Sequence, residues 1–386
     1  MLNTLKNYIK IVIVCMLRII LRVFWILPIK KNRIFFDAYN GNYTCNPKYI
    51  FEYLYRQYGS KVEYVWCLKD KALLPNIYQN VKSTKNRHWS YFYYLLTSKV
   101  YVSNSGIPAF VPIKKSQLFI DTTHGGGAYK KVGITESEKA NKKYGIFTAR
   151  LVAKETSYVI ASCKKYTEVI ANVNFVSKDN FLPIGMPRND MFFVENKERV
   201  QPIKKQLNLQ EKTGIVLYAP TFRGSMDNAW QVADIDVEKL LRALTNRFGK
   251  DFMCLFRSHY FVEKKHSSRQ MMDVSTYPDM QELLLIADVL ITDYSSSIWD
   301  FSFTGRPCFL YAPDLAAYKS ERDFYTPIES WPFPLAETNE QLEQNILNFS
   351  QEKYAENVKR HHKELGSFEK GTATESICNL IGQQLF

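Results

Sequence analysis

A glycine-rich segment with one histidine and two lysines directly follows an expected strand. Residues 121–131 read DTTHGGGAYKK. His124 could act as a general base, because an unperturbed imidazole has a pKa of about 6.5. Lys130 and Lys131 could counter phosphate charge, and the glycines could let backbone approach a ligand closely. The alternative is a glycine-rich turn whose histidine is hydrogen-bonded to backbone, and the segment matches neither the Walker pattern nor GxGxxG.

Hydroxyl side chains gather in residues 292–300, TDYSSSIWD, after another expected strand. Ser295, Ser296 and Ser297 stand where a helix is expected to begin, and helix N-termini expose unpaired N–H groups at a positive dipole end. These groups could bind a diphosphate, although an ordinary N-cap is the alternative. Two aspartates in the segment raise the possibility of a metal, but no third carboxylate has suitable spacing, so no metal is expected.

Arginines follow further strand ends. Arg257 and His259 in RSHY, and Arg223 in YAPTFR, could contact phosphate, because guanidinium groups bind it bidentately and imidazoles can donate to its oxygens. A surface ion pair is the alternative for either arginine. Arg188 lies in GMPRND, which is expected either to contact phosphate or acceptor or to form a turn whose Asn and Asp cap a helix.

The elements that must position these side chains alternate between short apolar strands and helices, which predicts doubly wound parallel sheets. The first expected strands are Ile34–Asp37, Glu63–Cys67, Lys99–Ser103, Gln117–Asp121, Tyr158–Ala161 and Asn180–Pro183. The second series is Ile215–Tyr218, Phe252–Phe256, Val289–Thr292 and Cys308–Tyr311. The expected helices are Pro47–Tyr58, Trp89–Thr97, 236–248, 279–287 and 296–304.

Two halves of similar size are expected, joined around residues 190–212. Ligands of such folds bind at loops beyond the carboxyl ends of strands, where the segments above lie. We therefore expect a cleft between the halves, with an anionic donor on one wall and a base on the other.

Composition narrows the class of protein. A chain of 386 residues exceeds one ordinary core, and its net charge of +13 predicts anionic lipid, nucleic acid or a phosphate-rich substrate as partner. No DNA- or RNA-binding motif is present, so nucleic acid is not expected. The seven cysteines form no CxxC pair and no cluster with histidine, which argues against zinc or disulfides and suits a reducing cytosol.

The most apolar stretch is residues 8–29, YIKIVIVCMLRIILRVFWILPI. Arg18 and Arg22 interrupt it, which disfavours a signal peptide and a spanning helix. Because both arginines share a helical face with Lys10, we expect a helix that lies in the membrane interface and ends at Pro28. A true span and a buried domain helix are the alternatives.

Six segments in order, DTTHGGGAYKKVG, GMPRND, YAPTFR, RSHY, TDYSSSIWD and GRPCFLYAPD, resemble the CDP-glycerol glycerophosphotransferase family. Members make teichoic acids and some capsular polysaccharides in bacteria. The resemblance runs from about residue 33 to about residue 375. It implies a GT-B-like fold of two Rossmann-like domains and peripheral attachment to the cytoplasmic face of the membrane.

By this resemblance, His124 corresponds to the family's proposed general base. Arg257, His259 and the three serines correspond to donor-phosphate contacts, and Arg322 in ERDFY stands where the family has an arginine before an aromatic pair. Asp323 replaces a glycine of the usual RGFY, and Thr123 replaces a tryptophan before the histidine. The GGGAYKK form looks closer to capsule-type members.

The sequence therefore predicts an α/β transferase with a membrane-associating helix at 1–30, an acceptor-side domain at 31–195 and a CDP-donor domain at 196–386, whose C-terminal helices could cross back. It is expected to move glycerol phosphate from CDP-glycerol to a hydroxyl of a polyprenyl-linked saccharide or glycerol phosphate acceptor, releasing CMP, without a cofactor. The alternatives are ribitol phosphate transfer from CDP-ribitol and a GT-B glycosyltransferase using a nucleotide sugar. Anionic membrane lipid is the other expected partner.

Overall fold

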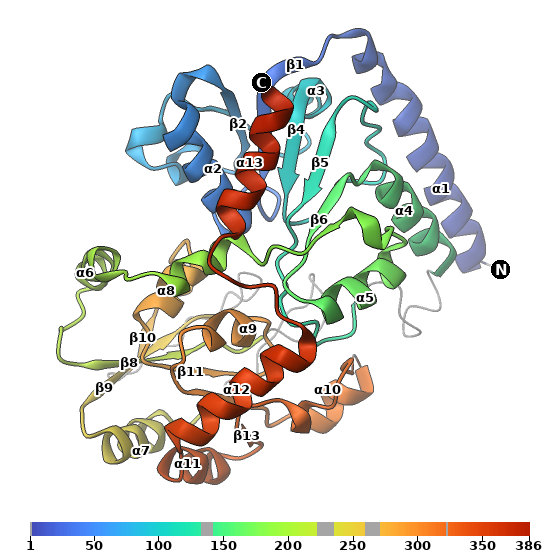
Figure 1. The fold of residues 1–386 in the computed structure, drawn as a ribbon. Helices are drawn as coiled ribbons and strands as arrows, with labels where there is room; N and C mark the ends of the chain where they lie inside the picture. The colour runs from blue at the N-terminus through green and yellow to red at the C-terminus, as the bar shows by residue number, and fades with distance from the viewer. Residues whose placement is uncertain (1, 133–141, 222–234, 259–270, 322) are drawn as a thin grey trace. The chain divides into compact units, whose positions relative to one another are not determined.

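The computed structural model describes residues 2–132, 142–221, 235–258, 271–321 and 323–386 (Figure 1). The chain divides into two compact units. Unit 1 comprises Met1–Gly125, Val132–Asp190 and Ser367–Phe386, and unit 2 comprises Gly126–Lys131 and Met191–Gly366. Residues 126–131 and 191–195, expected in the first half, thus belong to unit 2, and the last 20 residues return to unit 1.

Unit 1 is built on a seven-stranded parallel sheet in the order β3-β2-β1-β4-β5-β6-β7. Its strands are β1 Lys30–Asp37, β2 Glu63–Cys67, β3 Lys82–Thr84, β4 Ser98–Ser103, β5 Leu118–Asp121, β6 Tyr158–Ile160 and β7 Phe181–Leu182. The strand order reverses between β1 and β4, where Asp37 pairs with Ser103. Ligands of doubly wound sheets bind at the carboxyl edge beside such a reversal.

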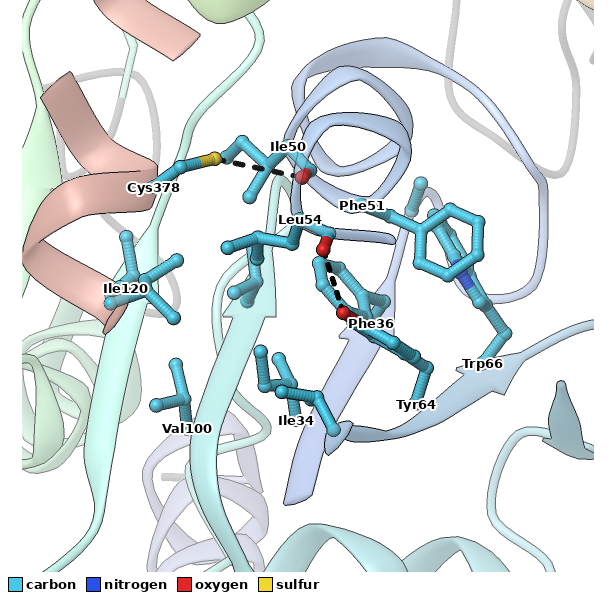
Figure 2. Close-up of a cluster of buried hydrophobic side chains, with 14 of the residues drawn as sticks. Ile34, Phe36, Ile50, Phe51, Leu54, Tyr64, Trp66, Val100, Ile120 and Cys378 are labelled. Carbon is cyan, nitrogen blue, oxygen red and sulfur yellow. Dashed lines mark hydrogen bonds between the residues drawn. The ribbon is translucent and has the colours of Figure 1, made fainter. Parts of the chain in front are cut away.

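Side chains that alternate along the strands cover both faces of this sheet. Ile34 and Phe36 of β1 enter one apolar cluster, and Phe35 between them enters the other. The first cluster receives helices α2 (Cys45–Tyr58) and α13 (Ala373–Leu385), which pack side by side (Figures 1 and 2). Figure 2 shows Cys378 of α13 with its thiol donating to the carbonyl of Ile50. The end of the chain therefore completes the core of unit 1.

The opposite face of the sheet is covered by α3, and further helices lie around unit 1. They are α1 Leu2–Leu21, α3 Trp89–Thr97, α4 Lys142–Glu155 and α5 Lys164–Asn174.

Unit 2 repeats the same strand order in a six-stranded parallel sheet, β10-β9-β8-β11-β12-β13. Its strands are β8 Gly214–Tyr218, β9 Phe252–Phe256, β10 Met271–Asp273, β11 Val289–Thr292, β12 Cys308–Tyr311 and β13 Leu335–Ala336. Its helices are α6 Lys197–Gln206, α7 Val237–Phe248, α8 Met280–Ile286, α9 Ser297–Ser302, α10 Leu315–Glu321, α11 Asn339–Leu347 and α12 Gln351–Leu365. The order reverses between β8 and β11.

The structure corrects the sequence reading in several places. The short strands β3, β10 and β13 were not expected, and the helix expected at 296–304 spans only Ser297–Ser302. The joining region expected at 190–212 contains α6. The N-terminal α-helix ends at Leu21 and continues as a 3₁₀ helix over Arg22–Ile26, instead of reaching Pro28.

Helix α1 packs beside α4 and buries Val14 and Leu21 together with Asn7 against unit 1. Arg18 pairs with Glu155 and donates to the carbonyl of Ala109 at 2.7 Å, so this arginine faces protein. The opposite face exposes large apolar side chains, namely Leu5, Tyr8, Ile9, Val12, Ile13, Met16, Ile19 and Ile20. Among the described residues, no helix has the length and apolar character needed to cross a bilayer.

Candidate active site

The glycine loop, His124–Lys131, follows β5 through a strained turn. Thr123 has a positive φ of 51°, and its N–H donates to a carboxylate oxygen of Asp121 at 2.9 Å. Burial raises the pKa of Asp121 to about 6, and this hydrogen bond partly opposes the rise. The turn brings His124 to the carboxyl edge of the unit 1 sheet, close to where the strand order reverses.

The ring of His124 has a defined orientation. Its Nδ1 lies 2.9 Å from the main-chain carbonyl of Asn104, in the loop after β4. A carbonyl only accepts hydrogen bonds, so Nδ1 carries the proton and the lone pair of the neutral ring lies on Nε2. The ring of Tyr39 meets the imidazole edge-on, with centroids 5.3 Å apart. The side chain of His124 is exposed. A hydrogen bond to backbone was considered above as an alternative to a role as base. Here the same bond orients the ring and leaves the basic lone pair on Nε2.

Arg188 holds the main chain of the glycine loop. It is buried, and its Nη2 donates to the main-chain carbonyl of His124 at 2.8 Å. The structure therefore gives this arginine a part in holding the loop, while its expected contact with phosphate or acceptor stays a prediction. The helix cap expected for its segment is present, because Asp190 accepts hydrogen bonds from the N–H groups of Ala373 and Thr374 at the start of α13.

The second half of the glycine loop is packed into unit 2. A Cβ on Gly126 would lie 2.1 Å from Cδ1 of Trp299, and one on Gly127 would lie 2.3 Å from the ring of Tyr129. A Cβ on Gly125 would meet nothing within 4 Å. Aromatic packing therefore requires glycine at 126 and 127. The sequence predicts that all three glycines let backbone approach a ligand closely, but of the three only Gly125 has open space beside it.

Two histidines that the sequence reading missed, the buried His361 and the partly buried His362, contact the aromatic side chains of this packing. His361 on α12 stacks on Tyr129, whose hydroxyl lies 3.0 Å from its Nε2. His362 stacks on Phe303, and its Nε2 lies 2.7 Å from the hydroxyl of Ser302. Burial lowers the pKa of each imidazole to about 4, so both are neutral at pH 7. Nothing in the sequence around HH distinguishes them from exposed helix residues.

The two lysines that end the loop join a short ladder with residues 323–325. Lys130 forms an antiparallel bridge with Phe324, and the ammonium of Lys131 pairs with Asp323 at 2.6 Å. The neighbouring ammonium holds the pKa of Asp323 below its usual range. Asp323 has a φ of 57°, a left-handed conformation that glycine adopts at little cost and that an aspartate adopts less readily.

In unit 2, a buried aspartate joins the loops after β8 and β11. Asp293 accepts hydrogen bonds from the N–H of Thr221 at 3.0 Å and from its hydroxyl at 3.1 Å. The hydroxyl of Thr292 donates to the carbonyl of Ala219 at 2.6 Å. The loops that follow β8 and β11 are therefore joined through Thr221 and Asp293 at the reversal of the unit 2 sheet.

The serine segment presents a local hydroxyl network at this edge. The hydroxyl of Ser297 donates to the hydroxyl oxygen of Ser295 at 2.9 Å, and the N–H of Ser297 donates to the same oxygen at 3.2 Å. Ser296 stands between them as the residue before α9. Ser296 is the N-cap residue of α9 and makes no side-chain cap hydrogen bond, so the ordinary N-cap that we considered is not formed by its hydroxyl. The contact of the three serines with donor phosphate remains a prediction.

Arg257 follows β9 at the same edge. Its N–H donates to the carbonyl of Tyr218 in β8, and its Nη1 donates to the carbonyl of Tyr277 at 2.7 Å, which fixes one side of the guanidinium. The other expected donor contacts, Arg223, His259 and Arg322, lie outside the described residues. Within the ranges that the structure describes, no three His, Cys, Asp or Glu side chains are grouped so as to hold a metal ion.

Comparison with known proteins gives consistent matches over almost the whole chain. The profile of the family described as CDP-glycerol:poly(glycerophosphate) glycerophosphotransferase matches residues 19–383. A teichoic acid poly(glycerol phosphate) polymerase of Bacillus spizizenii is 30% identical over 94% of this chain and 95% of its own length. A teichoic acid glycerol-phosphate transferase of Staphylococcus aureus is 29% identical over 98% of this chain and 99% of its own.

A solved structure of the wall teichoic acid polymerase TagF superposes with a TM-score of 0.80 and 26% identity, covering 99% of this chain and 97% of that one. Some related polymerases are longer, and the chain spans about half of them, 51% in the case of Staphylococcus epidermidis. Enzymes named for ribitol phosphate also match, including a ribitol-phosphate primase of Bacillus spizizenii at 26% identity.

Proposed function

The chain belongs to the CDP-glycerol:poly(glycerophosphate) glycerophosphotransferase family, and we propose that it transfers glycerol phosphate from CDP-glycerol to a hydroxyl of a membrane-linked acceptor. The product is a phosphodiester, and CMP is released. The proposed acceptor is a polyprenyl-linked saccharide or glycerol phosphate chain. The proposed pathway is teichoic acid or capsular polysaccharide synthesis.

The reaction is a direct phosphoryl transfer in one step. The acceptor oxygen forms a bond to the β-phosphorus of CDP-glycerol while the bond from that phosphorus to the oxygen of CMP breaks, and the hydroxyl proton passes to His124. The step includes no metal or other cofactor. Cationic and hydroxyl side chains held in fixed positions stabilise the negative charge that develops on the departing CMP.

The observation that carries this proposal is the geometry of His124. Its Nδ1 is committed to the carbonyl of Asn104, which leaves the lone pair of the neutral imidazole on Nε2, on an exposed side chain. A histidine held in one orientation is an effective general base when its unprotonated nitrogen can reach the proton that it removes. The arrangement thus suits removal of a proton from an acceptor hydroxyl.

The donor site is assigned to the carboxyl edge of the unit 2 sheet. Arg257 follows β9, and Ser295 and Ser297 follow β11; these strands flank β8, beside the β8–β11 reversal. Doubly wound sheets bind nucleotides at such a place. Arg223, His259 and Arg322 complete the proposed set of donor contacts. Because both units share one strand order, a GT-B-like pair of Rossmann-like domains is part of the proposal.

Helix α1 is proposed to attach the protein peripherally to the cytoplasmic face of the cell membrane. One side of α1 is held to unit 1 by Leu21 and by the pairing of Arg18 with Glu155 on α4, while its other side leaves large apolar residues exposed. An exposed apolar face of this kind suits a helix that lies on a membrane surface. Anionic lipid is the proposed surface, since the chain carries a net charge of +13.

The attachment is testable with two matched substitutions. Ile19→Asp on α1 should abolish co-sedimentation with vesicles containing anionic lipid, whereas Ile77→Asp should leave it intact. Both side chains are mostly exposed, at 67% and 74% of their surface, but Ile77 lies far along the chain from α1. If both variants sedimented with the vesicles to the same extent, α1 would have no role in attaching the protein to the membrane.

The activity is tested by measuring CMP release from CDP-glycerol and CDP-ribitol in parallel, with membrane-derived acceptor. We expect acceptor-dependent CMP from CDP-glycerol and a phosphodiester in the phosphorus NMR spectrum of the product. Release from CDP-ribitol alone would favour the ribitol alternative. The protein could instead bind CDP but release CMP from neither donor, and form a glycoside from a nucleotide sugar. That result would replace the proposal by the glycosyltransferase alternative.

A further inference from the structure

The main chain leading to His124 is held by a buried amide side chain from another element. Asn46, at the start of α2, is fully buried. Its Nδ2 donates to the carbonyls of Thr122 and Thr123 at 2.9 and 3.1 Å, and its Oδ1 accepts from the N–H of Arg188 at 3.1 Å. One side chain therefore joins the β5 loop to the segment after β7.

Arg188 holds the next residue of the same loop. Its Nη2 donates to the carbonyl of His124 at 2.8 Å, and its Nη1 lies 3.1 Å from the sulfur of Cys45. A buried guanidinium is costly unless it is hydrogen-bonded, and its planar fork offers donors in fixed directions that an ammonium lacks. The cost of burying the Arg188 guanidinium is therefore offset by the hydrogen bond with which it holds the main chain at His124.

The imidazole is held from a third element. Asn104 provides the carbonyl that faces Nδ1, and its own side-chain oxygen accepts from the N–H of Tyr39 at 2.9 Å and from the hydroxyl of Ser105 at 3.0 Å. The carbonyl is thus part of a hydrogen-bonded turn and cannot easily turn away. Main chain and ring of His124 are fixed independently.

We propose that Asn46 and Arg188 are positioning residues for the transfer reaction, which hold His124 so that Nε2 is the atom that accepts the proton. This inference rests on the proposed function. Each side chain acts through a main-chain carbonyl of the β5 loop, and a displacement of about 1 Å at a reacting group costs roughly 100-fold in rate.

The chain contains a matched control for Asn46. Gln117, before β5, is also buried, its Nε2 donates to the carbonyls of Leu95 and Ser98 at 2.8 and 2.7 Å, and its Oε1 accepts from the N–H of Lys114 at 3.0 Å. In both Asn46→Asp and Gln117→Glu, an amide that donates to two main-chain carbonyls is replaced by a carboxylate. The carboxylate oxygen repels those carbonyl oxygens in the same way in each variant. The two substitutions act at opposite ends of β5.

The two variants are compared by CMP release and thermal unfolding. Both should unfold at lower temperature, but only Asn46→Asp should lower kcat, by about 10- to 100-fold, with KM for CDP-glycerol within about twofold of the unmodified protein. Equal losses of kcat in the two variants would show that Asn46 acts only through general stability and would overturn the positioning role.

The tautomer is tested without any assay of activity. Long-range proton–nitrogen NMR spectra of protein labelled with nitrogen-15 histidine should show His124, identified by its loss in His124→Asn, with a protonated Nδ1 and an unprotonated Nε2 at pH 8. The opposite tautomer would overturn the assignment of Nε2. If the predicted tautomer is found but His124→Asn turns over normally, the base of the proposed function is wrong although the positioning geometry is real.

Discussion

Units 1 and 2 share a strand order, yet burial shifts the pKa of aspartates at strand ends in unit 1 and of histidines on α12 in unit 2. In unit 1, burial raises the pKa of Asp37, at the end of β1, to about 7, and that of Asp121, at the end of β5, to about 6. In unit 2, burial lowers the pKa of His361 and His362 to about 4. Burial favours the neutral form in each case, so the same physical cause gives the two units opposite responses to acid.

The largest predicted effect is that local stability changes in opposite directions in the two units when the pH falls from about 7.5 to about 5.5. The histidines titrate near 6.5 when unfolded, so their contribution to stability is present above 6.5 and is lost as the pH falls toward 4. The aspartates titrate near 4 when unfolded, so their contribution is present below 4 and is lost as the pH rises through 6 to 7. On acidification, local opening should increase in α12 and decrease in β1, by up to about tenfold per pH unit for each group.

Hydrogen exchange measured segment by segment, and corrected for the intrinsic effect of pH, tests this comparison. Asp37→Asn should flatten the response of β1 and leave that of α12 unchanged, and His361→Gln should do the converse. A common response of both segments to acid would contradict the opposed pKa shifts.

The glycine loop sharpens the comparison, because the chain leaves unit 1 between Gly125 and Gly126. Gly126→Ala should destabilise the protein by roughly 1–3 kcal/mol, because its methyl group has no room against Trp299. Gly125→Ala adds the same group one residue earlier, where nothing lies within 4 Å, and should leave the unfolding temperature nearly unchanged. Thermal unfolding of the pair checks this.

A similar loss of stability in both alanine variants would mean that the loop is constrained along its whole length and not only in the part that belongs to unit 2. Unchanged stability in both would show that Trp299 can move away from the loop.

The smallest effect is expected at the ladder between the loop and residue 323. Asp323→Gly removes the half-exposed ion pair with Lys131, which contributes up to about 1 kcal/mol, and relieves a left-handed conformation that costs an aspartate a comparable amount. The net change should be below about 1 kcal/mol and should depend on salt, as measured by thermal unfolding at low and high ionic strength. A large, salt-independent loss would point to another role for Asp323.

Much of the scaffold was predictable because apolar strands are local patterns. The helix expected over Trp89–Thr97 has those bounds, and the parallel pairing of β1, β2, β4 and β5 follows from helices between strands. Strands of two or three residues such as β3 and β13 carry too few side chains for a periodicity. The return of α13 to unit 1 depends on packing between the two ends of the chain, which no local pattern encodes.

The candidate site was predictable in residue type but not in contact. His124 was singled out because a histidine beside glycines after a strand is chemically suggestive, whereas Asn46 looks like any residue at a helix start. For Arg188 the sequence left a contact with phosphate or acceptor and a place in a turn as alternatives, and only the structure shows its donation to the carbonyl of His124. Positioning groups act through main-chain atoms, and main-chain partners leave no mark on sequence.

The central claim is that His124 removes the proton of the acceptor while other groups bind the donor. The most direct test measures CMP release and calorimetric CDP affinity on His124→Asn and on the unmodified protein. We predict a loss of turnover of roughly 100- to 10,000-fold with CDP affinity unchanged within about twofold. Turnover equal to that of the unmodified protein, with CDP still bound, would contradict the assignment of the base.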